Sequence, residues 1–267
     1  MRGECGCGHG GRTHQIWRDG LLWRQGSTGG GRGECLVKPR YAIYFTPANR
    51  SPWWDFGAHW LGRDESTDTT LPQPRVAGIS AEALQQATIY PRRYGFHATL
   101  KAPFALTESV DLELLKIRMH ALAATLSPVS LGPMEAIRMG DFVALAPRHP
   151  PPNLATLEAA CVTTLDDMRE PLSPLDLVRR LSPQLDARAL DLLNQYGYPH
   201  VLERFQLHMT LTSPVNDVLA TKVIQAVSDT VDQLNARCPM VLDRLCVFKE
   251  PGPGQAFRRL FDVALSP

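Results

Sequence analysis

The chain has 267 residues, of which 44% are hydrophobic and 21% charged, and its formal net charge at pH 7 is +1. A net charge so close to zero excludes the strong positive field that attracts long nucleic acids or acidic membranes. The sequence has no apolar run of the roughly 18 residues that a membrane-spanning helix needs, so we expect no membrane partner.

Residues 1–39 differ from the rest of the chain. They contain 11 of the 20 glycines and no sustained apolar period. Such a segment cannot bury enough apolar surface to offset the entropy lost on ordering, so we predict a disordered tail or a misassigned start. Cys5, Cys7 and His9 are spaced too closely for a typical zinc site, and no matching second pair accompanies them. We therefore expect no metal and no other cofactor.

The cellular location is predicted from the cysteines and the N-terminus. Cys161, Cys238 and Cys246 are odd in number and scattered, which favours a reduced protein. The N-terminus lacks the apolar stretch and cleavage site of a signal peptide. We predict a cytoplasmic monomer in which residues 40–267 form one domain.

The predicted elements alternate between strands and helices. A strand at residues 40–47 directs Tyr41, Ile43 and Phe45 to one face, and Ala42, Tyr44 and Thr46 to the other. The remaining predictions are helices at 51–64, 109–126, 154–168, 183–194 and 217–236, and hairpins at 135–147 and 241–265. The aromatic face of the first helix is predicted to pack in the core.

Two stretches of the sequence repeat the same pattern. "RRYGFHATLKAPF" and "ERFQLHMTLTSPV" align as Arg-x-x-(Phe/Leu)-His-x-Thr-Leu-x-x-Pro, with every matched residue offset by 111 positions. Arg93, His97 and Thr99 match Arg204, His208 and Thr210. A helix and then a hairpin follow each copy. This order predicts a duplicated, two-lobed α+β fold, in which each lobe is an antiparallel sheet with helices on its outer face.

The two copies also predict a shared polar site. In a strand, alternate residues face opposite sides, so Arg93, Gly95, His97, Thr99 and Lys101 would line one face while apolar neighbours fill the other. Two such stripes facing a cleft would bring together two imidazoles, two hydroxyls and several cations.

This set of groups is suited to a phosphoester. Two imidazoles can serve as base and acid, because their ordinary pKa lies near 6.5. Hydroxyls and cations can bind phosphate oxygens. An ordinary duplicated strand with two structural histidines is one alternative. A metal site is another, although neither motif carries a second ligand at a suitable spacing.

The paired His-x-Thr-Leu motifs resemble the signature of the two-histidine (2H) phosphoesterase superfamily. Together with "YAIYFTP", "SPWWDFGAHWLGRD" and "YGYPHVLERFQLHMTLT", they are similar to a bacterial branch often encoded among phosphonate-utilisation genes. The resemblance covers residues 40–267. It implies a metal-independent enzyme that hydrolyses a small cyclic phosphodiester.

The resemblance implies roles for particular residues. His97 and His208 would be the acid–base pair, with either one as the base, and Thr99 and Thr210 would hold the phosphate. Arg93, Arg204, Lys101 and Tyr44 are further candidates for substrate binding. The alternatives are a non-catalytic protein that binds a phosphorylated metabolite or nucleotide, and a phosphodiesterase acting on 2',3'-cyclic RNA ends.

Overall fold

The computed structural model describes residues 38–183 and 185–266. The predictions for the glycine-rich segment, including Cys5, Cys7 and His9, lie outside these residues, apart from Lys38 and Pro39.

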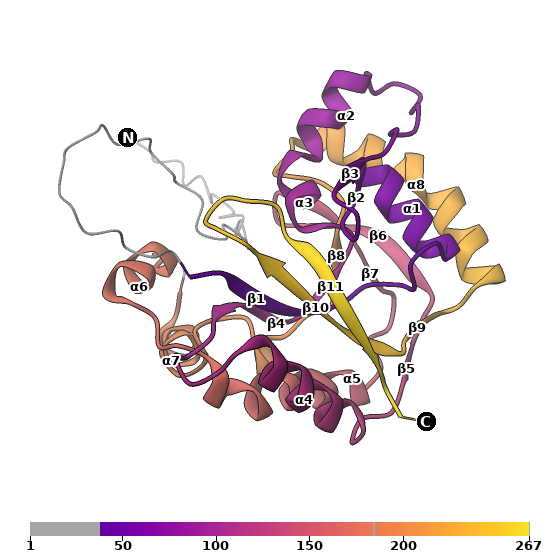
Figure 1. Ribbon diagram of the computed structural model, residues 1–267. Helices are drawn as coiled ribbons and strands as arrows, with labels where there is room; N and C mark the ends of the chain where they lie inside the picture. Colours follow the sequence, from indigo (N-terminus) through magenta and orange to yellow (C-terminus); the bar gives the residue numbers. More distant parts are fainter. Residues whose placement is uncertain (1–37, 184, 267) are drawn as a thin grey trace, which may run out of the picture.

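A central antiparallel sheet organises the structure (Figure 1). Its strands, in spatial order, are β11 (Arg258–Ala264), β10 (Arg244–Glu250), β1 (Arg40–Phe45), β4 (Ala98–Ala105), β8 (Met209–Thr210), β7 (Phe142–Pro147) and β6 (Met134–Met139). Two small sheets pair β2 (Arg63–Asp64) with β3 (Thr69–Thr70), and β5 (Val129–Gly132) with β9 (Met240–Leu242).

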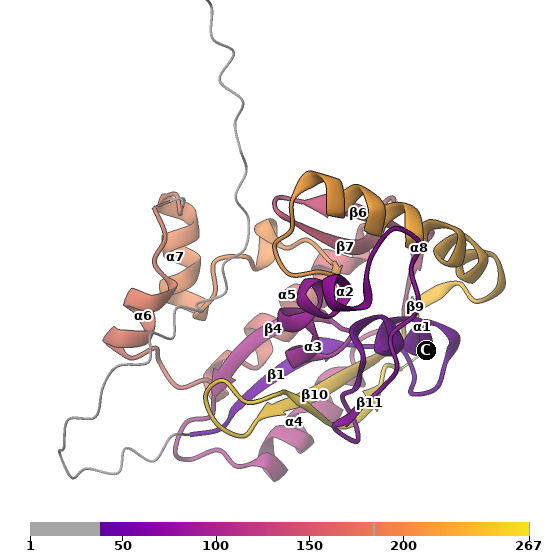
Figure 2. The ribbon, with the colours of Figure 1, turned by 90° about the horizontal axis from the view of Figure 1, so that it is seen from above.

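Helices pack against the strands of both halves of the sheet (Figure 2). They are α1 (Pro52–Leu61), α2 (Ala81–Ala87), α3 (Ile89–Tyr94), α4 (Leu112–Ala123), α5 (Asn153–Thr164), α6 (Pro174–Arg180), α7 (Ala187–Tyr196) and α8 (Asp217–Arg237), with short 3₁₀ turns η1 (Asp166–Met168) and η2 (Leu202–Arg204). Helix α4 packs on β10 and β11, α5 packs on β4, and α8 packs on β6 and β7. None of the described helices is long and apolar enough to span a membrane.

Helix α1 is bounded by capping residues at both of its ends. The Ser51 side chain accepts a hydrogen bond from the Trp54 amide at 3.3 Å, and Pro52 occupies the first turn. The helix ends at Gly62, which adopts the left-handed conformation at φ 75°. Trp53 and Trp60 are buried, so the predicted core role of this aromatic face is confirmed.

Strand β1 separates two apolar clusters. Tyr41, Ile43 and Phe45 belong to the main core, which continues through α4, α5 and α8. Ala42 and Tyr44 face the other side, where they pack with Cys246, Phe248 and Phe257. The predicted alternation of this strand is therefore confirmed, and Tyr44 lies on the face opposite the main core.

The α+β class, the antiparallel pairing and the positions of most of the long helices and hairpins are confirmed. The structure adds that the two lobes share one sheet, joined where Ala98 of β4 pairs with Met209 of β8. Helices α2 and α3 and the small sheet of β5 and β9 were not predicted.

The prediction that each polar stripe starts at an arginine within a strand is wrong, because both arginines lie in helical segments before the strands. Arg93 lies in α3, and Gly95 follows with φ 81°, so strand β4 starts only at Ala98. In the second copy, Arg204 lies in η2, before β8. Neither arginine shares a strand face with its histidine, because a backbone turn separates them.

Candidate active site

The two histidines lie just before the neighbouring strands β4 and β8. Ala98 pairs with Met209 in an antiparallel register. Carried one residue further in each direction, this register sets His97 against Thr210 and Thr99 against His208. This register implies that each histidine faces the threonine of the other motif on one side of the sheet, and Thr99 and His208 do line one pocket.

Both imidazoles are held by the main chain in the same way. The Nδ1 atom of His97 lies 2.9 Å from the Gly95 carbonyl oxygen, and that of His208 lies 2.8 Å from the Gln206 carbonyl oxygen. Because a carbonyl can only accept, Nδ1 carries the hydrogen in each ring and Nε2 carries the lone pair of the neutral form. The Thr99 hydroxyl oxygen lies 3.4 Å from Nε2 of His97.

Tyr44 stacks on His97. The ring centroids are 3.9 Å apart and the planes are inclined by 27°. The Tyr44 side chain is only 1% exposed, and its ring also packs against Phe248. The structure thus places Tyr44 beside the motif, where it forms one wall around the imidazole.

The surroundings favour neutral imidazoles. Burial, the largest cause, and the charge of a protonated His208 together lower the pKa of His97 to about 4, against the opposing effect of the Gly95 carbonyl. Burial also lowers the pKa of His208, against the effect of the Gln206 carbonyl. Simultaneous protonation of the two rings is disfavoured, so the pair is suited to holding one proton at a time.

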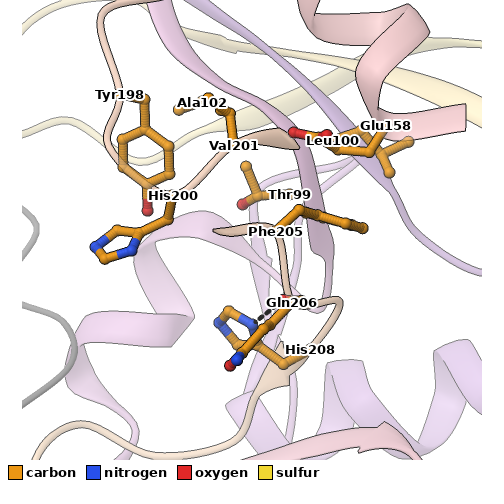
Figure 3. Close-up of a pocket in the computed structure, with 10 residues that line it drawn as sticks. All are labelled: Thr99, Leu100, Ala102, Glu158, Tyr198, His200, Val201, Phe205, Gln206 and His208. Carbon is orange, nitrogen blue, oxygen red and sulfur yellow. Dashed lines mark hydrogen bonds between the residues drawn. The ribbon is translucent and has the colours of Figure 1, made fainter. Parts of the chain in front are cut away.

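A small pocket opens beside the motifs (Figure 3). Its lining includes Thr99, His208, Glu158, Tyr198, His200 and Phe205. Glu158, Tyr198 and His200 were not among the predicted site residues. Glu158 had one signal in the sequence, because it is a carboxylate within the apolar face of a helix, between Leu154 and Val162.

Glu158 is buried and partly satisfied by the main chain. Its side chain is 1% exposed, and Oε2 accepts a hydrogen bond from the Leu202 amide at 3.1 Å. Burial raises the pKa of Glu158 to about 7, while the Leu202 hydrogen bond and the charge of Lys101 act to lower it. This carboxyl group can therefore exist in either protonation state near neutral pH.

The structure does not bring Lys101 to the predicted stripe. Its ammonium group donates to the Val162 carbonyl at 2.9 Å and forms an ion pair with Asp166 at 3.0 Å. Thr99 pairs with Tyr44 of β1, whereas Lys101 pairs with the adjacent Ile43. Because cross-strand partners share a face, this register shift turns Lys101 toward the core side, away from Thr99.

Both candidate arginines are held in ion pairs. Arg93 pairs with the buried Glu250, and its Nε donates to the Gln255 carbonyl at 3.0 Å. Arg204 contacts both carboxylate oxygens of Asp186, at 2.7 and 2.6 Å. Among the residues that the structure describes, no group of three or more His, Cys, Asp or Glu side chains is arranged to hold a metal ion.

Comparisons with known proteins identify relatives of the chain. The family model described as "Protein of unknown function (DUF1045)" matches residues 99–258. Two curated relatives carry the name ribose 1,5-bisphosphate phosphokinase PhnN. The protein from Janthinobacterium sp. (strain Marseille) is 36% identical over 222 residues, which are 82% of this chain and 49% of the relative. The protein from Laribacter hongkongensis (strain HLHK9) is 32% identical over 226 residues, with 82% and 50% covered.

The chain thus spans about half the length of these curated relatives. Among solved structures, it is similar to Escherichia coli LigT complexed with NADP+, with 13% identity, a TM-score of 0.35, and 86% of this chain and 99% of that chain covered. It is also similar to Kluyveromyces marxianus Usb1 with uridine monophosphate, with 12% identity, a TM-score of 0.38, and 84% and 99% covered.

The match to the family model covers more than half of the chain, including Thr99 and the whole second motif. The placement of both motifs on neighbouring central strands agrees with the predicted resemblance to the two-histidine phosphoesterase superfamily. The chain belongs to the DUF1045 family.

Proposed function

We propose that this chain is a phosphoesterase that hydrolyses a small cyclic phosphodiester with His97 and His208 as its acid–base pair. The observation that carries the proposal is the matched fixation of both imidazoles. Each Nδ1 is bound to a main-chain carbonyl two residues earlier, which makes Nε2 the basic atom of each neutral ring and supports a role in proton transfer.

The reaction needs one neutral and one protonated imidazole. Nε2 of the neutral ring takes a proton from the attacking water as its oxygen bonds to phosphorus. The ring P–O bond breaks, and the leaving alkoxide takes a proton from the other imidazolium. Thr99 and Thr210 donate hydrogen bonds to the non-bridging phosphate oxygens. The negative substrate favours protonation of one ring, which offsets the effect of burial.

The relatives' name supports a ribose-based substrate. Their printed name contains ribose 1,5-bisphosphate. Hydrolysis of a 5-phosphoribosyl 1,2-cyclic phosphate at the bond between phosphorus and O2 yields that compound. We therefore propose that this chain supplies the substrate of a phosphokinase, in a role linked to phosphonate metabolism.

We propose that this chain does not itself carry out the phosphokinase reaction of the relatives' name. No lysine in this sequence follows a glycine, so the Gly-Lys-(Ser/Thr) end of a P-loop is absent from it. The paired histidines instead favour ester hydrolysis by general acid–base catalysis.

The test is turnover of a panel of cyclic phosphates by the purified chain in EDTA. The panel contains 5-phosphoribosyl 1,2-cyclic phosphate and 2',3'-cyclic nucleotides, and phosphorus NMR identifies the bond that opens. We expect His97→Ala and His208→Ala each to lower kcat by about 10²- to 10⁴-fold. His120→Ala, at an exposed position, serves as the control and should retain wild-type turnover.

Other outcomes of this panel distinguish the alternatives. Turnover of 2',3'-cyclic nucleotides alone would indicate RNA ends as substrates. Activity that disappears in EDTA would indicate a metal-dependent reaction. Binding without turnover would overturn the proposal in favour of a phosphometabolite-binding protein.

A further inference from the structure

The pocket beside the motifs contains polar groups that the proposed hydrolysis does not use. Glu158 enters it from α5, whereas Tyr198 and His200 enter from the segment between α7 and η2. In Figure 3, Tyr198 and His200 lie across the pocket from Glu158, with Thr99 between them. Because Thr99 and His208 also line this pocket, a group bound there would lie next to the reacting phosphate.

The burial of Glu158 requires an explanation beyond helix stability. It lies between the core residues Leu157 and Cys161 on the inner side of α5. A buried carboxyl group costs free energy unless it is hydrogen-bonded or paired. Leu202 donates one hydrogen bond to Oε2, but a carboxylate has about four acceptor positions. The group thus has the capacity to bind a donor from a ligand in the pocket.

The side chains that line the pocket favour a hydroxyl group as the ligand group that binds Glu158. A second phosphate group would be repelled by a buried carboxylate, and the nearby Lys101 is already paired with Asp166. A hydroxyl group can donate to Glu158 in its ionised form. It can also accept from the protonated form, which is accessible because burial raises the pKa to about 7. The Phe205 ring adds an apolar wall suited to the carbon face of a sugar.

We propose that Glu158 binds the sugar hydroxyl adjacent to the cyclic phosphate, so that the enzyme selects a hydroxylated pentose ring over a simple alkyl cyclic phosphate. In 5-phosphoribosyl 1,2-cyclic phosphate this group is the 3-hydroxyl. The inference rests on the proposed function, because the cyclic phosphate must lie at His97 and His208. Glu158 is thus a specificity residue that contacts substrate away from the bond that breaks.

The test compares three substrates in the full chain. They are 5-phosphoribosyl 1,2-cyclic phosphate, its 3-deoxy analogue, and ethylene phosphate, which has no hydroxyl group. Wild type should prefer the 3-hydroxy substrate over the 3-deoxy analogue by about 10-fold or more in kcat/KM. Glu158→Met should reduce this preference to within about 3-fold, and Glu158→Gln should reduce it partly. Turnover of ethylene phosphate should change little in either variant.

Controls keep the result interpretable. Glu113→Gln, an exposed change on α4, should retain the wild-type preference. If Glu158→Met does not fold, as judged by circular dichroism, Glu158→Gln carries the test because it keeps an acceptor for the Leu202 amide. An unchanged preference in the variants, or equal losses on all three substrates, would overturn the inference.

If the proposed function is wrong, the experiment gives a different result from the one expected if only the hydroxyl site is wrong. In that case wild type hydrolyses none of the three esters, and calorimetry replaces turnover. Tighter binding of ribose 5-phosphate than of 3-deoxyribose 5-phosphate, lost in Glu158→Met and reduced in Glu158→Gln, would still support the hydroxyl site. Equal binding of the two sugars by wild type would overturn it.

Discussion

Tyr44 covers one face of the His97 imidazole, with their ring centroids 3.9 Å apart. The contact joins strand β1 to the first motif, because Tyr44 is the cross-strand partner of Thr99. Phe248 lies beside Tyr44, at 5.0 Å between centroids, and its ring centroid is 6.3 Å from that of His97. This aromatic wall excludes water from one side of His97 and contributes to the burial that lowers its pKa.

The stack predicts a difference between two substitutions of Tyr44. Tyr44→Phe keeps the ring against His97 and should retain kcat within about 3-fold. Tyr44→Leu removes the ring, hydrates the imidazole and should lower kcat by about 10-fold or more. It should also raise the pKa of His97, measured by NMR titration. Equal losses in both variants would assign the effect to the hydroxyl group instead of the stack.

The folding stability should depend on the titration of His97. Its pKa is about 4 in the folded chain, against 6.5 ordinarily. The unfolded chain binds the proton more readily between these values, so this contribution to stability is lost as the pH falls from about 6.5 toward 4. The loss is about 2 kcal/mol at pH 5. Urea unfolding at pH 7.5 and 5 should show it in wild type and in His120→Gln, but not in His97→Gln.

Glu158 should contribute a pH dependence of the opposite sign. Its pKa rises from 4.5 to about 7 on folding, so the folded chain holds the proton more tightly. The associated stability is present below pH 4.5 and is lost as the pH rises through 7. Glu158→Gln lacks this loss, so its unfolding free energy relative to wild type should increase by about 2–3 kcal/mol from pH 4.5 to pH 8. A difference that does not change with pH would contradict the raised pKa.

Lys101 should matter for stability and not for substrate binding. Lys101→Met removes the donor to the Val162 carbonyl and one partner of Asp166, which retains Arg169 at 2.9 Å. We expect a destabilisation of about 1–3 kcal/mol in urea unfolding. KM should remain within about 3-fold of wild type, as it should in the exposed control Lys116→Met. A large rise in KM for Lys101→Met alone would restore its predicted role in binding substrate.

Gly95 should be essential for the position of His97. It has φ 81°, and an added Cβ would lie 2.7 Å from the Glu65 Cβ. Gly95→Ala should therefore shift the carbonyl that holds His97 Nδ1 and cost about 1–3 kcal/mol. Turnover should fall at least about 10-fold. The control is Gly132→Ala, at φ 68° with nothing within 4 Å of the added Cβ, which should lose stability without losing turnover.

Several parts of the fold could be predicted from local sequence pattern. Alternation placed Tyr44 on the face of β1 opposite Tyr41 and Phe45, and helical periodicity located α4 and α8. The repeated His-x-Thr motif identified two matched histidines, which in the structure lie just before the neighbouring strands β4 and β8. These features were predictable because strand and helix periods are properties of neighbouring residues.

Which polar residues lie together in the candidate site depends on long-range packing. A register shift of one residue between β1 and β4 separates Lys101 from Thr99, and the backbone turn at Gly95 separates Arg93 from His97. Glu158 joins the pocket from α5, a helix more than 50 residues along the chain from Thr99. Such placements depend on which elements pair and pack across the chain, and the local period of a single segment does not contain that information.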